Sequence, residues 1–308
     1  MATAPVAAAA DASLPLPAAD AAPEFLGDVI TESRVLYPLL VGGWMAESEH
    51  RYAEQRLGVS VRYVDNRKRR WIDVYFYPAG VQSARTLELV AGSERDGISS
   101  AAHETGRPVE LGALESFTLR PGSAEGAGVP AWRLGLAYPD DTLASAMLLF
   151  AHGLYLVKAR ASAAEPPATV DSLQRELEAF MASVAGQLRI VNTGACWLPA
   201  RTEIAAALPA ADGDGVLASY RDPGHEVAAV VVDGRVRVAQ AEAARAPALA
   251  AQLTEVLYPG CVAPETINPD VPPALREIRI EYRSPAASEG PSHGPRIGRP
   301  RPPLLGTG

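Results

Sequence analysis

Residues 142–190, TLASAMLLFAHGLYLVKARASAAEPPATVDSLQRELEAFMASVAGQLRI, predict the centre of the fold. Two apolar runs flank His152-Gly153, which is typical of a β-hairpin. The second run, Leu154–Arg160, is mostly apolar before its charged end, which predicts a central strand covered on both faces. A helix is indicated from Val170 to Ile190, with Thr169 as its N-cap. Its apolar residues recur every three or four positions and form one stripe: Leu173, Leu177, Phe180, Val184 and Leu188.

Two runs nearer the N-terminus predict a second hairpin. Val59–Tyr63 alternates apolar and polar residues, and Ile72–Tyr77 is rich in β-branched and aromatic residues. The basic run Arg67-Lys68-Arg69-Arg70 falls in the loop between them. We expect solvated charges there, which discourage pairing between sheet edges, and contact with an anionic ligand is the alternative.

The remaining signals of this half complete one domain. A helix is indicated over Ala84–Thr105, although the interior glycines Gly92 and Gly97 weaken the signal. Strands are expected at Leu114–Leu119 and Trp132–Tyr138. Short strands with few crossover helices favour an α+β fold, with a mainly antiparallel sheet packed by amphipathic helices, over residues 25–195.

Residues 196–283 predict a smaller β-β-β-α-β unit. Its sharpest signal is Asp233-Gly234 between two β-rich runs, which is typical of a two-residue hairpin turn. Residues 199–215 are rich in Ala, Pro, Gly and Asp and are expected to be a connection. The five elements of the unit are expected at Val216–Tyr220, Val227–Val232, Arg235–Val238, Ala246–Tyr258 and Ile278–Tyr282.

Both ends of the chain have the composition of disordered segments. Residues 1–24 are rich in Ala and Pro and contain no Lys or Arg. The small residues of Val6–Asp11 look like the end of a signal peptide without its basic start, so we interpret them as the remnant of a leader. A disordered tail on a cytosolic protein is the alternative. Residues 284–308 are rich in Pro and Gly, and Pro300-x-x-Pro303 matches a polyproline ligand pattern.

The composition excludes several classes of protein. The chain has 308 residues, 48% of them hydrophobic, which suits a globular protein. Its formal net charge of −8 argues against nucleic-acid binding, which usually needs a basic surface. No apolar run approaches the roughly 18 residues that would span a bilayer, so no integral membrane segment is expected.

The two cysteines, Cys196 and Cys261, match no zinc-binding pattern, because such patterns need close pairs. They are either free and buried or joined. In an oxidising compartment we predict a disulfide, which would close a loop of 65 residues, the difference between 261 and 196.

Three stretches resemble uncharacterised, exported α+β proteins of proteobacteria: LGVSVRY (Leu57–Tyr63), DVYFYPAG (Asp73–Gly80) and GLYLVKAR (Gly153–Arg160). The similarity covers residues 25–190 and rests on the texture of the strands. It implies export and an antiparallel α+β unit, and it implies no activity.

No coherent catalytic set emerges from the sequence. Gly97-Ile98-Ser99-Ser100-Ala101 approaches a nucleophile elbow but has Ala where the final Gly belongs. If the chain were a hydrolase, the weak candidates would be Ser99, His103, His152 and Asp140. No cofactor site, metal site or phosphate-binding loop is indicated.

We therefore expect an exported protein, periplasmic or secreted, with a non-enzymatic binding or structural role. Its partner would be a protein or a small molecule. One alternative is an envelope hydrolase whose residues come together from distant positions. The other is a cytosolic protein that binds partners.

Overall fold

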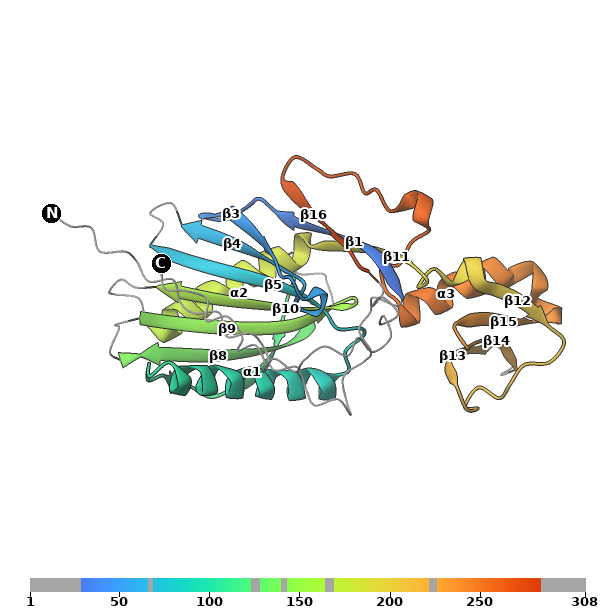
Figure 1. Ribbon diagram of the computed structural model, residues 1–308, viewed down its shortest axis with the longest axis horizontal. Helices are drawn as coiled ribbons and strands as arrows, with labels where there is room; N and C mark the ends of the chain where they lie inside the picture. Colours follow the sequence, from blue (N-terminus) through green and yellow to red (C-terminus); the bar gives the residue numbers. More distant parts are fainter. Residues whose placement is uncertain are drawn as a thin grey trace, which may run out of the picture.

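A computed structural model describes residues 29–65, 69–122, 128–139, 143–163, 169–221 and 226–283. It confirms an α+β fold in which the sheets are mainly antiparallel (Figure 1). Within the described residues, nine strands form the main sheet in the order β2-β3-β4-β5-β10-β9-β8-β6, with β7 also paired to β8. These strands are β2 (Leu40–Val41), β3 (Trp44–Arg51), β4 (Val59–Asp65), β5 (Arg70–Pro78), β6 (Glu110–Leu111), β7 (Glu115–Leu119), β8 (Val129–Tyr138), β9 (Leu143–His152) and β10 (Tyr155–Ala163).

Both predicted hairpins are present in the main sheet. β4 pairs with β5, and β9 pairs with β10 across a turn in which Gly153 has a φ of 57°. β10 lies between β5 and β9, and its side chains are buried on both faces except for the half-buried Arg160. The prediction of a covered central strand is therefore confirmed.

The main sheet has a helix on each face. On β5, Ile72, Val74 and Phe76 pack with the helix α2 (Val170–Gln187). Tyr75 and Tyr77 alternate with them and therefore point to the other face, where they pack under the helix α1 (Ala84–Glu104). Figure 1 shows α1 running along the lower edge of the sheet, beside β8.

The α2 helix begins where the sequence predicted and ends three residues early. The Thr169 side chain accepts a hydrogen bond from the Ser172 amide at 3.2 Å, and the Ser172 hydroxyl accepts one from the Thr169 amide at 3.0 Å. The expected helical end, through Ile190, is wrong: Arg189–Gly194 form the strand β11. β11 pairs with β1, so an available strand edge overrides the helical pattern there.

A second, three-stranded sheet covers part of the α2 face of the main sheet. Its middle strand is β1 (Ile30–Pro38), flanked by β11 and by β16 (Leu275–Glu281). The inward residues of β16, Ile278 and Ile280, join the same core as α2. The last strand thus belongs with β1 and not with the smaller unit in which the sequence placed it, because β1 offers it a full antiparallel partner.

The smaller unit is inserted between β11 and β16. A four-stranded sheet, in the order β12-β15-β14-β13, packs against one helix, α3. Asp233 and Gly234 have positive φ values of 51° and 68°, which confirms the two-residue turn between β14 and β15. β12 lies within the stretch expected to be a connection and pairs in parallel with β15. These elements are β12 (Thr202–Ala205), β13 (Val216–Arg221), β14 (Val227–Val232), β15 (Arg235–Ala239) and α3 (Ala246–Leu257).

A disulfide closes the base of this insert. Cys196 and Cys261 are bonded, with their Cα atoms 6.1 Å apart, as the sequence predicted for an oxidising compartment. Beside the bond, the Asn192 amide donates to the Gly260 carbonyl and the Val262 amide donates to the Asn192 carbonyl, each at 2.8 Å. The segment that enters the insert and the segment that leaves it are therefore held together at one point, at the end of the main sheet (Figure 1).

Candidate functional site

The structure separates the residues proposed for a hydrolase. Ser99 and His103 lie four residues apart on α1 and are both exposed. Ser99 is inside a helix, whereas a nucleophile elbow needs a turn between a strand and a helix. His152 ends β9, where burial lowers the pKa of its imidazole and favours the neutral form. Asp140 lies outside the described residues.

His152 and Ser99 are at opposite ends of the sheet. Ile98, next to Ser99, packs with Leu143 at the start of β9. His152 ends the same strand nine residues later, about 30 Å away in an extended chain. Of the three hydrolase candidates within the described residues, only Ser99 and His103 therefore share one surface.

A groove lies beside the first turns of α1. Its volume is about 660 Å³. One wall is α1, and the other is formed by β7 and the start of β8, where Ser116 pairs with Trp132 and Phe117 with Ala131. We call this surface the α1 groove, and it is lined by Ala84, Arg85, Leu87, Glu88, Leu89, Ser116, Phe117, Pro130, Ala131 and Trp132.

The α1 groove is apolar with a polar rim. Leu89, which lines the groove, is 56% exposed. Arg85, Glu88 and Ser116 supply its polar groups. On its outer side β7 pairs with no other strand of the described part of the chain. An extended, largely apolar ligand fits such a surface, because side chains can enter the groove beside a free strand edge.

A buried ion pair holds the middle of α1 to the sheet. Lys158 Nζ lies 3.2 Å from Glu94 Oε2, and the two side chains are only 8% and 4% exposed. The ammonium group also lies 4.8 Å from the ring of Tyr75 and 5.6 Å from that of Tyr77. Burial raises the pKa of Glu94, and the nearby cations Lys158 and Arg160 oppose that rise. Glu94 Oε1 is buried without a hydrogen-bond partner among the described residues.

The ion pair and the α1 groove belong to one row of the sheet. Tyr75, Lys158, Leu149 and Trp132 are direct neighbours on β5, β10, β9 and β8. The ion pair that holds α1 to the sheet is therefore in line with Trp132, which lines the groove. The position of α1 sets the width of the groove.

The sequence contains a signal for the ion pair that strand and helix periodicity alone does not reveal. The buried residues of α1 step at helical intervals through Leu87, Val90, Ala91, Glu94 and Ile98. A glutamate inside an apolar stripe needs a buried partner. Lys158, inside the apolar run of β10, is the matching signal.

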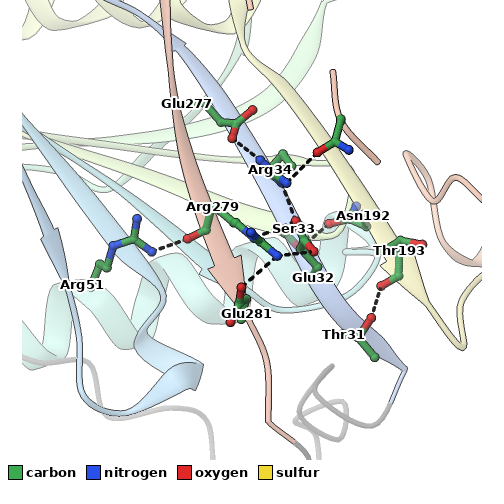
Figure 2. Close-up of polar contacts among 11 residues, drawn as sticks. Thr31, Glu32, Ser33, Arg34, Arg51, Asn192, Thr193, Glu277, Arg279 and Glu281 are labelled. Atoms are coloured by element: carbon green, nitrogen blue, oxygen red, sulfur yellow. Dashed lines mark hydrogen bonds and ion pairs between the residues drawn. The ribbon is translucent and has the colours of Figure 1, made fainter. Parts of the chain in front are cut away.

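The outer face of the three-stranded sheet is the other dense polar surface (Figure 2). Arg34 pairs with Glu32 and Glu277, and Arg279 pairs with Glu32 and Glu281. These charges satisfy one another and tie β16 to β1. We assign this surface a role in holding the sheet together.

On the inner face of the same sheet, a buried hydrogen-bonded chain joins the two sheets. The Tyr155 hydroxyl donates to Ser33 Oγ, which donates to Asn192 Oδ1, each at 2.6 Å. Burial raises the pKa of Tyr155 to about 12, so its hydroxyl stays protonated. These three hydrogen-bonded side chains are buried and are part of the core.

The described residues offer neither a metal cluster nor a helix that spans a membrane. No three of their His, Cys, Asp and Glu side chains lie close enough together to hold a metal ion. Among the same residues, no helix is long and apolar enough to cross a membrane. The chain matches no known protein-family model, and a comparison with curated proteins finds none that is similar to it.

Proposed function

We propose that this chain is an exported, non-enzymatic binding protein that takes an extended, largely apolar ligand in the α1 groove. The observation that carries the proposal is the groove itself, which exposed Leu89 and half-buried Trp132 both line beside β7, a strand whose outer edge pairs with no other strand of the described residues. A concave apolar surface with a few polar groups is the usual form of a binding site.

The disulfide supports the export part of the proposal. Bonds of this kind form and persist mainly outside the cytosol. Cys196 and Cys261 are both buried, so the bond is a structural one.

Binding at the groove is tested with an apolar fluorescent probe, 1-anilinonaphthalene-8-sulfonate. We expect Leu89→Glu to lower the fluorescence gain of the probe severalfold, because it places a charge in the groove. Val256→Glu is the matched control, since Val256 is 65% exposed on α3, outside the groove. Equal probe binding by the two variants would contradict the proposal.

Export is tested by thiol labelling of the chain recovered from the periplasm of a cell that produces it with a leader. We expect Cys196 and Cys261 to resist labelling until a reductant is added. Two reactive thiols in denatured, unreduced periplasmic protein would contradict export as the native state.

A further inference from the structure

We propose that the occupant of the α1 groove is a segment of this same chain, the proline- and arginine-rich stretch RPRPPLL (Arg299–Leu305). This inference rests on the proposed binding role of the groove and names its ligand. Three properties of the segment support it: where it leaves the folded body, how far it reaches, and the chemistry it brings.

The chain leaves the folded body at the end of the sheet where α1 begins. The Arg283 amide, at the last described residue, donates to Gln55 Oε1 at 3.1 Å. Tyr52, three residues before Gln55, packs in the same cluster as Leu87 of the groove and half-buried Trp132. The exit point and the groove therefore flank one apolar cluster.

The registers of the main sheet give the distance to be crossed. One row of paired residues runs from Arg51, near the exit point, to Phe117 of the groove. Six strand spacings of about 4.8 Å make this roughly 29 Å. The row consists of Arg51, Val59, Phe76, Val157, Phe150, Ala131 and Phe117.

The segment is long enough to reach the groove. Arg299 follows Arg283 by 16 residues. In a polyproline helix, at about 3.1 Å per residue, these 16 residues span roughly 50 Å. The surplus of about 20 Å over the straight path allows the chain to follow the curved surface.

The segment also has the chemistry that suits the groove. Proline-rich segments bind to aromatic-lined grooves because their extended form costs little conformational entropy. Half-buried Trp132 presents its ring to the α1 side of the sheet at the groove, and exposed Leu89 offers an apolar contact for Leu304 or Leu305.

Charge favours the same occupant. Residues 284–308 contain three arginines and one glutamate, which gives this segment a formal net charge of +2. Because the formal net charge of the whole chain is −8, the rest of the chain carries −10. Glu88, exposed on the rim, forms no ion pair with another described residue and can take one arginine of the segment. Arg85, three residues earlier on α1, opposes a second one.

The test compares the full chain with a chain that ends at Arg283. A fluorescein-labelled peptide of residues 294–308 is added to each, and its anisotropy reports binding. We expect the shortened chain to bind the peptide, and the full chain to bind it at least tenfold more weakly because its own segment competes. The shortened chain should also bind the naphthalene probe more strongly than the full chain.

Matched variants of the shortened chain locate the site. We expect Leu89→Glu and Glu88→Lys to weaken peptide binding at least tenfold, Arg85→Ala to strengthen it, and Val256→Glu to leave it unchanged. Circular dichroism melts verify that each variant is folded. A peptide that fails to bind, or binds all variants equally, would overturn this inference.

Two results separate this inference from the proposed function. If the naphthalene probe binds at Leu89 equally in the full and shortened chains, the groove is a binding site but the C-terminal segment is not its occupant. If the full chain forms dimers that the shortened chain does not, the segment acts between copies, and the intramolecular form of the inference is wrong.

Discussion

Lys158 and Glu94 show how two residues fix the placement of a helix. Each buries a charge that only the other and its neighbours can compensate, and α1 cannot leave the sheet without separating them. The pair therefore defines the position of α1 more sharply than its apolar contacts do, since those tolerate small shifts.

Lys158→Met is expected to destabilise the protein by about 3–5 kcal/mol at pH 7, because it leaves a buried carboxylate without its counter-charge. Adding Glu94→Gln should recover most of this loss, since both charges are then gone. Urea unfolding of the two single variants and the double variant measures the coupling. The exposed Glu88→Gln serves as the control and should change stability by less than about 0.5 kcal/mol.

The same pair predicts a dependence on pH. The pKa of Glu94 is raised in the folded state above its ordinary value of 4.5. Between pH 4.5 and that raised pKa, the Glu94 carboxyl group is therefore protonated more fully in the folded protein than in the unfolded one. The contribution of Glu94 to stability therefore falls as the pH rises from 4.5 through its folded pKa. The difference in unfolding free energy between the wild type and Glu94→Gln should shrink or reverse over that range. A difference that grows with pH would contradict the assignment.

Two glycines of neighbouring elements provide a matched pair of substitutions. At Gly58, with a φ of 61°, a Cβ would lie 2.0 Å from the Phe76 carbonyl oxygen. At Gly92, inside α1, a Cβ would meet nothing within 4 Å. Gly92→Ala should stabilise by about 0.5–1 kcal/mol through helix propensity. Gly58→Ala should destabilise by more than that, and thermal melts of the two variants compare them directly.

At the level of elements, periodicity predicted what local sequence controls. The β4–β5 and β9–β10 hairpins, α1, the start of α2 and the Asp233-Gly234 turn are where the pattern placed them. The pattern did not find β3, whose exposed positions are mostly polar or charged, or β11, which follows directly on a helical stripe. Both strands form because a neighbouring strand, β4 for β3 and β1 for β11, offers an edge to pair with. That pairing depends on the tertiary structure and cannot be read from the local sequence.

The α1 groove lay beyond the reach of sequence reasoning for a similar reason. Leu89 and Trp132 are 43 residues apart, the difference between 132 and 89, and neither lies in a motif. Only the order of strands brings the start of β8 next to the start of α1. The disulfide, by contrast, could be predicted, because the chain contains only two cysteines.

At the level of the whole molecule, the disulfide closes a 65-residue loop that contains the entire insert. Replacing both Cys196 and Cys261 by Ser should lower the free energy of unfolding by about 4 kcal/mol, through the entropy of the unfolded chain. Urea unfolding with and without reductant tests this, and reductant should have no effect on the double variant. An equal effect of reductant on both proteins would contradict the prediction.

The closed base of the insert also has a consequence for proteolysis. A protease that cuts any exposed turn of residues 197–260 would produce two fragments that stay covalently linked through Cys196 and Cys261. The nicked molecule would migrate as one band on a gel without reductant and as two bands with it. A cut in the insert would therefore leave the fragment before it, which contains the main sheet, linked to the fragment that carries β16. The nicked molecule would keep its α1 groove in surroundings rich in proteases.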